Sequence, residues 1–264
     1  MNAPLDRIEI ESVGSDPVAL ATAVLAQLPG LAPPVPIHDI ALTLDIVAIE
    51  ERPFITLEGC LQTDPLKNLG IIAVNAKSGE RRQRFTIAHE LGHFLNERHR
   101  PTDIGLFKCS AQDMSNPSGE ERHIVQEREA NQFAIELLAP RSMMTTALNE
   151  EPDLTRACAL ADDLNISREA TIRRYAEMHD ETLAAVFSQN GKIRYVCKPD
   201  NFPNLSCWSG NLLPDPPIEP GEAKCSAMNE ADPRDWLLAP HGKELFAQTL
   251  LQQNGFATTL LLIE

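Results

Sequence analysis

Three things are scarce in this chain: positive charge, paired cysteines and long apolar runs. Its 264 residues carry 23 Lys and Arg against 38 Asp and Glu, which leaves a formal net charge of −15. So few cations argue against direct nucleic-acid binding, because basic surface is needed to offset phosphate charge. The acidic excess suits a basic protein partner, and it also favours solubility.

The six cysteines are scattered, and no two of them form a C-x-x-C pair. This spacing argues against a disulfide framework and a second zinc site, and it favours free thiols in a reducing compartment. No apolar run approaches membrane-spanning length, and residues 1–11 lack the basic start of a secretory signal. We therefore expect a cytoplasmic protein with a core large enough for one large or two modest domains.

The most informative run that is present is His89-Glu90-Leu91-Gly92-His93. Positions i and i+4 of a helix lie on one face, so both imidazoles can bind one metal ion. Glu90 lies beside them, where a carboxylate can take a proton from the water that a catalytic metal activates. Apolar residues recur around the run at helical spacing, and Gly92 would let a neighbouring backbone come close. The pattern is typical of a zinc hydrolase, and a chance match on a surface helix is the alternative.

A second helix is predicted between residues 118 and 140. Ser118 and Glu121 have the spacing of a capping box, and Pro140 marks the end of the helix. Catalytic zinc sites keep three protein ligands, so this helix is the candidate source of the third.

Glu127 is the residue of this helix that we assign as the third ligand. It shares a face with Asn131 and lies next to the small residues Ala130 and Ala134, which would let the helix approach the His pair closely. Glu129 points about 200° away from Glu127. Asn131 would bond the free ring N–H of a ligating histidine and fix its tautomer. The alternative is a solvated acidic helix face.

These motifs resemble those of the ImmA/IrrE metallopeptidases. The resemblance is carried by RFTIAHELGH at 84–93, EREANQFA at 127–134, LLAP at 137–140 and the preceding strand GIIAVN at 70–75, and it covers residues 33–180. It implies that the glutamate four residues before the asparagine is the third ligand, in agreement with the face argument. It also implies a site like that of thermolysin-like gluzincins and, as in several family members, cleavage of helix-turn-helix repressors.

The order of predicted elements favours an α+β fold. We expect a zincin-like metallopeptidase domain at 1–150, a helix-turn-helix-like segment at 151–180 and a smaller mixed α/β domain, with a regulatory role, at 181–264. Asn190-Gly191 between two strand-like runs predicts a hairpin, and residues 258–263 read as a buried terminal strand. The other predicted elements are helices at 17–28 and 37–44, strands at 46–50, 54–62 and 69–75, and a loop at 96–117.

The segment 153–178 has the pattern of two short helices around Asn165-Ile166-Ser167. Acidic residues outnumber basic ones there, so we interpret it mainly as a packing module. A DNA-binding role stays open because three arginines fall on the would-be recognition helix: Arg168, Arg173 and Arg174.

Cys109 lies in the predicted loop, from which it could reach the metal as an inhibitory ligand; a passive thiol is the interpretation that we favour. A donor for the oxyanion is also needed. Four residues are candidates, which the sequence does not rank and which each read more simply as surface or capping residues: His99, His123, Tyr175 and His179.

The sequence therefore predicts a zinc-dependent endopeptidase, with manganese as the alternative metal. His89, His93 and Glu127 would hold the ion, and Glu90 would be the catalytic base. The expected substrate is a basic helix-turn-helix repressor of the XRE type, in a stress or mobile-element response. The competing function is a non-catalytic, zinc-containing transcriptional regulator or antirepressor that acts by binding protein or DNA. The oligomeric state stays open.

Overall fold

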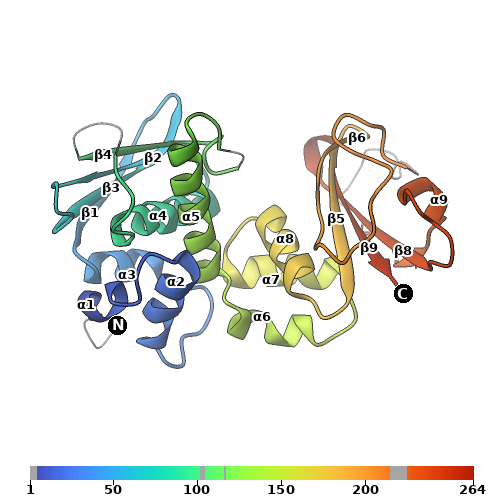
Figure 1. The fold of residues 1–264 in the computed structure, drawn as a ribbon, viewed down its shortest axis with the longest axis horizontal. Coiled ribbons are helices and arrows are strands. Elements are labelled where there is room, and N and C mark those ends of the chain that lie inside the picture. The colour runs from blue at the N-terminus through green and yellow to red at the C-terminus, as the bar shows by residue number, and fades with distance from the viewer. Residues whose placement is uncertain (1–4, 102–104, 116, 215–224) are drawn as a thin grey trace. The chain divides into compact units, whose positions relative to one another are not determined.

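The computed structural model describes residues 5–101, 105–115, 117–214 and 225–264 (Figure 1). The chain divides into two compact units, each with its own sheet. The first comprises Met1–Pro140 with Asp163–Ser167, and the second comprises Arg141–Asp162 with Arg168–Glu264. In the described ranges, no helix has the length and apolar character needed to cross a membrane. The α+β fold is as predicted.

The sheet of the first unit has the strand order β1-β3-β2-β4. β1 runs parallel to β3, whereas β2 is antiparallel to both β3 and β4. Its inner face is apolar, with Leu61 and Ile72 fully buried. The strands are β1 (Ile46–Arg52), β2 (Leu57–Thr63), β3 (Gly70–Asn75) and β4 (Leu106–Ser110).

β4 lies inside the stretch 96–117, so the prediction of a loop there is wrong for residues 106–110. Phe107 and Cys109 are buried while Lys108 between them is exposed, which is the alternation of a half-buried strand. Five residues are too few for this pattern to stand out, and pairing with β2 decides the structure. Residues 102–104 and 116 of the predicted loop lie outside the described residues.

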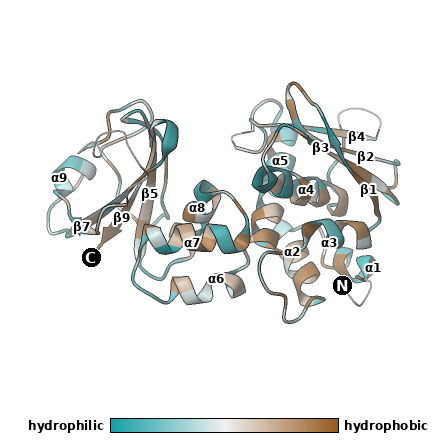
Figure 2. Cartoon of the chain, turned by 180° about the vertical axis from the view of Figure 1, so that it is seen from behind, coloured by the Kyte–Doolittle hydropathy of each residue, from teal (hydrophilic) through white to brown (hydrophobic). Residues whose placement is uncertain are grey.

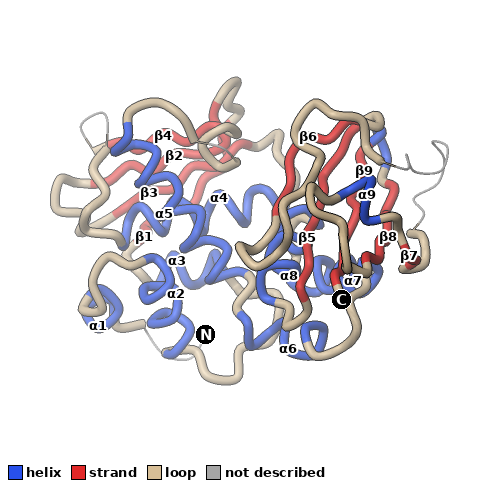
Figure 3. Tube along the Cα trace, turned by 45° about the vertical axis from the view of Figure 1, so that its right-hand side comes forward, coloured by secondary structure: helices blue, strands red, loops and turns tan. Residues whose placement is uncertain are grey.

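The helices of the first unit lie on one side of its sheet, with α4 nearest to the strands (Figures 1 and 3). The predicted helices at 17–28 and 37–44 are confirmed to within two residues, and Asp16 caps α2 by accepting from the Ala19 N–H at 2.8 Å. In Figure 2 the apolar α2 is brown, whereas α5 begins teal. The helices are α1 (Arg7–Glu11), α2 (Pro17–Ala26), α3 (Ile37–Thr43), α4 (Glu80–Leu95) and α5 (Glu121–Leu138).

The predicted capping box at the start of α5 is wrong. The N-cap is Glu120, and it makes no side-chain capping bond. The Ser118 hydroxyl instead accepts a hydrogen bond from Gln112 Nε2 at 2.8 Å. Because Ser118 bonds Gln112, which lies outside the helix, its hydroxyl does not cap α5 as the local sequence pattern predicted.

Two glycines let α4 pack closely against its neighbours. A Cβ on Gly59 of β2 would lie 2.3 Å from Thr86 Cγ2 of α4, which no side chain tolerates. A Cβ on Gly92 would lie 3.0 Å from Phe133 Cδ1 of α5. Gly92 thus admits a neighbouring helix, as expected, but the group that approaches it is an aromatic side chain.

The second unit has an antiparallel sheet of order β6-β5-β9-β8-β7. The predicted hairpin and terminal strand are confirmed. Asn190 and Gly191 join β5 to β6 with φ of 50° and 74°, the conformation that such a two-residue turn requires. The elements are α6 (Arg141–Leu148), α7 (Leu154–Leu164), α8 (Arg168–Met178), β5 (Thr182–Gln189), β6 (Lys192–Cys197), β7 (Asn229–Glu230), α9 (Pro233–Trp236), β8 (Leu245–Leu251), η1 (Gln253–Gly255) and β9 (Phe256–Ile263).

The two helices of the helix-turn-helix-like segment form, and the second packs on the sheet. α8 lies against β5, and its Arg174 is 6% exposed. The Arg173 guanidinium lies 5.9 Å from the centre of the Tyr195 ring of β6. Two of the three arginines that kept a DNA-binding role open are therefore engaged within this unit, which favours the interpretation of a packing module.

Candidate metal centre

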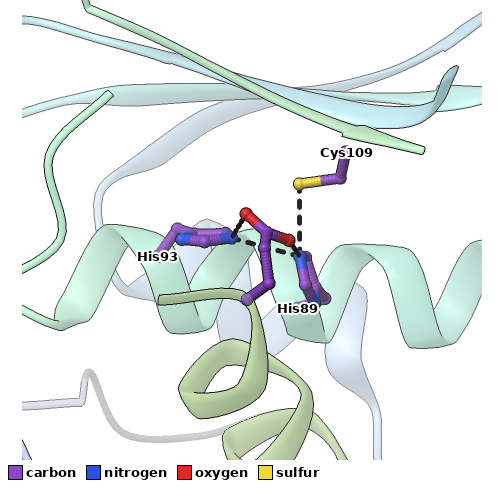
Figure 4. A group of neighbouring side chains, drawn as sticks. His89, His93 and Cys109 are labelled. Carbon is purple, nitrogen blue, oxygen red and sulfur yellow. Dashed lines mark hydrogen bonds and ion pairs between the residues drawn. The ribbon is translucent and has the colours of Figure 1, made fainter. Parts of the chain in front are cut away.

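The two histidines of the central motif lie on the buried face of α4 and point toward a common spot (Figure 4). Neither His89 nor His93 is exposed, and their Nε2 atoms are 3.1 Å apart. At this separation the two Nε2 atoms cannot both be protonated and point their N–H bonds at each other. At least one Nε2 lone pair therefore faces the space between the rings. Because the two histidines lie one helical turn apart, their Nε2 atoms converge as a pair of potential metal donors.

Glu127 of α5 completes a three-donor cluster with these histidines. Its Oε2 is 3.1 Å from His89 Nε2, and its Oε1 is 3.3 Å from His93 Nε2. Burial raises the pKa of this carboxyl, but hydrogen bonds from His89 and His93 outweigh it and hold that pKa well below its ordinary value. The side chain is thus an anion facing two imidazoles.

α5 approaches α4 through a face of small residues. Ala130 and Ala134 are fully buried on it, as the choice of Glu127 assumed. Asn131 lies one turn from Glu127, and its Oδ1 is 2.9 Å from His89 Nδ1. The Asn131 amide also donates to the Asp113 carbonyl at 2.9 Å, which fixes its orientation. With Nδ1–H donating to Asn131, His89 would offer the Nε2 lone pair to a cation that replaces the proton shared with Glu127.

His93 is oriented by two residues that the sequence did not single out for this task. Its Nδ1 is 3.0 Å from His99 Nδ1, and His99 Nε2 is 2.8 Å from Glu129 Oε2. His99 is fully buried, so the reading of it as a surface or capping residue is wrong. Burial lowers the pKa of His99 to about 2, with His93 and Lys67 acting in the same direction, and the ring stays neutral.

A neutral His99 allows one consistent arrangement of protons. Its Nε2–H donates to Glu129, so its Nδ1 lone pair accepts from His93 Nδ1–H. His93 Nε2 is then free to bind a cation. Glu129 therefore acts on the cluster through His99, although its helical position points it away from Glu127.

Lys67 secures the end of α4 beneath the cluster. Its Nζ donates to the carbonyls of His93 at 2.6 Å and Asn96 at 2.8 Å, which are groups of the last turn. A cation at a helix C-terminus is favourable there. Burial lowers the pKa of Lys67 to about 7, with smaller contributions from Arg100 and Arg7. No motif in the sequence marks this lysine.

Glu90 is a buried carboxylate with almost no hydrogen-bond partners. Among the residues that the structure describes, its oxygens are approached by no donor other than the Cys109 thiol, and the residue is not exposed. Burial raises its pKa to about 7, against the opposing effects of His89 and the Cys109 thiol. Its Oε1 lies 3.1 Å from the position of a Cβ on Gly59, which places it between α4 and β2. Such a poorly satisfied group indicates a missing polar partner.

Cys109 is the fourth member of the cluster. Its Sγ is 3.2 Å from His89 Nε2, and one ligand atom from each of four residues lies within 4.8 Å of the others: His89, His93, Cys109 and Glu127. Burial, with Glu90 and Glu127 nearby, raises the pKa of this thiol well above its ordinary value. The structure thus places Cys109 on β4, within reach of the cluster.

The remaining candidates for the oxyanion donor are now placed. His123 Nε2 is 3.1 Å from Asp113 Oδ1, and its Nδ1 is 3.6 Å from Glu127 Oε1. Tyr175 and His179 belong to the second unit, where His179 Nε2 is 3.1 Å from the Glu150 carbonyl.

The cluster fits a divalent metal ion. Tetrahedral donors at the usual zinc distances lie about 3.3–3.6 Å from one another, and the contacts that link the three nitrogen and oxygen donors are 3.1 to 3.3 Å long. Imidazole and carboxylate together suit zinc and related metals. The buried Glu90, to which the described residues offer no donor except the Cys109 thiol, is a second sign that a polar group belongs here.

Comparisons with known proteins agree with this site. Residues 54–175 match the Peptidase_M78 family model, the IrrE N-terminal-like domain. Among solved structures, a transcriptional regulator of Mycobacterium tuberculosis has a similar fold, with a TM-score of 0.54 and 14% identity over 97% of this chain and 79% of that chain. A search of curated proteins found no match. Residues 54–175 hold the whole cluster, and the domain that they form is similar to that of the ImmA/IrrE metallopeptidases, the family that the motifs predicted.

Proposed function

We propose that this chain is a zinc-dependent endopeptidase with its metal held by His89, His93 and Glu127. One observation carries the proposal: a buried carboxylate, Glu90, for which the described residues supply no donor except the Cys109 thiol, lies beside three convergent metal donors. A structural metal site needs no such group, whereas a hydrolytic site needs a base next to the metal.

The bound cation supplies Lewis acidity, which polarises a scissile carbonyl and makes a water molecule more acidic. Glu90 accepts the proton of the attacking water at its carboxylate and passes it to the leaving amine. Burial raises the pKa of this carboxyl, which makes it a stronger proton acceptor than an exposed carboxylate. Of the candidate donors for the oxyanion, we favour His123. It is half-exposed, is bonded to Asp113 and contacts the proposed metal ligand Glu127.

The proposed substrate is a basic helix-turn-helix repressor of the XRE type, in a stress or mobile-element response. Two observations support it. The chain carries a net charge of −15, which attracts a basic partner. Its similarity to the ImmA/IrrE family, and in fold to a transcriptional regulator, fits a role in the control of transcription.

The test is cleavage of a purified helix-turn-helix repressor by the zinc-loaded chain and by Glu90→Gln. We expect the variant to bind zinc normally and to lose about 10²-fold or more in cleavage rate, because its proton acceptor is gone. Glu121→Gln, an exposed position on α5, is the matched control. Equal cleavage by wild type and Glu90→Gln, at equal zinc content, would remove Glu90 from the reaction and refute the proposal.

One observation favours a second function, a zinc-containing regulator or antirepressor without catalysis. With Cys109 included, the cluster offers four donors, which is the arrangement of closed structural zinc sites. Such a protein would bind its repressor without cleaving it, and Glu90→Gln would leave the binding unchanged. If the partner were DNA, the affinity would fall steeply with salt.

A further inference from the structure

The fourth side chain of the cluster comes from the sheet, whereas the other three come from the helices α4 and α5. Cys109 of β4 points from the sheet toward His89, as Figure 4 shows, and its Sγ is 3.2 Å from His89 Nε2. A catalytic zinc site leaves its fourth position open, whereas a closed site fills it with a protein donor. In this structure the Cys109 thiol is the fourth potential donor beside the other three.

Glu90 argues that this closed arrangement is not the working one. Its carboxylate is fully buried and lies against Gly59, the residue that pairs with Cys109 in the β2–β4 register. Base and thiol therefore face the same small space. Among the described residues the weakly donating thiol is the only hydrogen-bond donor to this carboxylate, so most of its desolvation is uncompensated.

β4 is placed to release the thiol. Among the described strands it lies at the edge of the sheet and pairs with β2 alone, through a ladder that is irregular between Leu57 and Gly59. Phe107 of the same strand stacks on His93 with ring centres 4.9 Å apart. Two residues of one edge strand thus cover both histidines, and an outward movement of β4 would uncover them together.

We propose that Cys109 is a displaceable fourth metal ligand that holds the site in a closed, inactive form. The proposal rests on the proposed function and adds its regulation. The thiol loses its proton when it binds the cation and regains one when it leaves, with no redox change. Opening would break the metal–sulfur bond and some of the β2–β4 hydrogen bonds, and it would let water and substrate reach the cation.

The experiment begins with spectroscopy of the full chain loaded with Co²⁺ in place of zinc. Wild type should show the near-ultraviolet charge-transfer absorption of a thiolate bound to cobalt. Cys109→Ser and Cys109→Ala should lose that absorption and still bind cobalt. Cys60→Ser is the matched control, because Cys60 pairs with Lys108 on the neighbouring strand and lies outside the cluster. It should keep the absorption.

Absence of the thiolate absorption in wild type, or its persistence in the Cys109 variants, would overturn the proposal. The wild-type and Cys60→Ser spectra keep the proposal open to refutation even if the Cys109 variants do not fold, because loss of the absorption in either protein would overturn it. Failure of cobalt to bind at all would overturn the metal centre, and with it both proposals.

The second measurement is repressor cleavage by the zinc-loaded variants. If the closed form holds nine-tenths of the molecules, Cys109→Ala should cleave about tenfold faster than wild type. Cys60→Ser should match wild type. A slower Cys109→Ala of normal zinc content would refute the inhibitory role. Thiolate absorption without cleavage by any variant would leave Cys109 as a ligand but refute the peptidase and the switch.

Discussion

At the scale of single residues, the proposed metal centre depends on groups outside the cluster of donors. His89 is held by Asn131, and His93 is held by His99, which in turn is held by Glu129. Each of these bonds consumes the Nδ1 proton of a ligand and leaves its Nε2 lone pair for the cation. The two histidines look equivalent in the motif, yet one is oriented by an amide and the other by a second imidazole.

The first prediction concerns Glu129. We expect Glu129→Ala to weaken zinc binding by about 10- to 100-fold, because His99 loses the acceptor that fixes its tautomer and His93 is no longer oriented. Zinc affinity is measured by competition with a chromophoric chelator. Glu121→Ala, on the same helix and exposed, should bind as wild type does. An unchanged affinity in Glu129→Ala would show that the His99 contact is incidental.

The second prediction concerns the pH dependence of stability in the second unit. Burial lowers the pKa of His179, whose Nδ1 accepts from the Glu181 N–H at 3.1 Å. The folded chain therefore binds this proton less readily than the unfolded chain does. Stability from this residue is fully present above the ordinary pKa of 6.5 and falls as the pH drops below it.

Denaturant unfolding between pH 7.5 and about 5 tests this linkage. His179→Gln should flatten the decline below pH 6.5, while His241→Gln, at an exposed position of the same unit, should keep the wild-type slope. Identical slopes in all three proteins would mean that His179 titrates alike in the folded and unfolded chains.

At the scale of elements, the close packing of α4 on β2 brings Glu90 and Cys109 into one space. The contact exists because Gly59 has no side chain where Thr86 passes over it. β2 carries Gly59 on the face that β4 continues with Cys109, since these two residues are paired. One small residue therefore sets how near the helix of the histidines lies to the strand of the thiol.

The third prediction follows from this contact. Gly59→Ala should destabilise the first unit by about 1–3 kcal/mol, because the new Cβ would lie 2.3 Å from Thr86 Cγ2 and α4 must shift. Removing that methyl in the double variant Gly59→Ala/Thr86→Ser should restore part of the loss. Gly79→Ala is the control, since no atom lies within 4 Å of its Cβ position. Denaturant midpoints give the values, and equal stability of wild type, Gly59→Ala and Gly79→Ala would contradict the packing argument.

At the scale of the whole molecule, the metal should stabilise one unit and not the other. All four cluster residues belong to the first unit, and the second has its own buried core around Phe202, Trp236 and Leu237. A ligand that binds only the folded form stabilises the part of the chain that holds it. The stability of the first unit should therefore report on metal binding, and that of the second unit should serve as an internal reference.

The fourth prediction is the effect of removing the metal. Zinc at about 100 times its dissociation constant should stabilise the first unit by about 2.7 kcal/mol, and its melting temperature should rise by about 5–10 °C. A chelator should reverse the rise, and His93→Ala should abolish it. Calorimetry should show one transition that moves with zinc and one that does not. A shift of both by equal amounts would mean that the units unfold together.

Much of the fold could be predicted because its signals are local. The helical spacing of the His pair, the Asn190-Gly191 turn and the apolar run at 258–263 each specify their structure within a few residues. β4 and the true start of α5 could not be predicted in this way. Both depend on partners elsewhere in the chain, β2 for the strand and Gln112 for the hydroxyl of Ser118.

The same division holds at the site. The sequence by itself determined which residues could bind a metal from one helix, because side chains four positions apart must share a face, and it pointed to Glu127 and Asn131 on the second helix for the same reason. Only the tertiary structure decided that Cys109, His99, Glu129 and Lys67 join them. Their contacts cross between separate elements, and such contacts follow from how the elements pack.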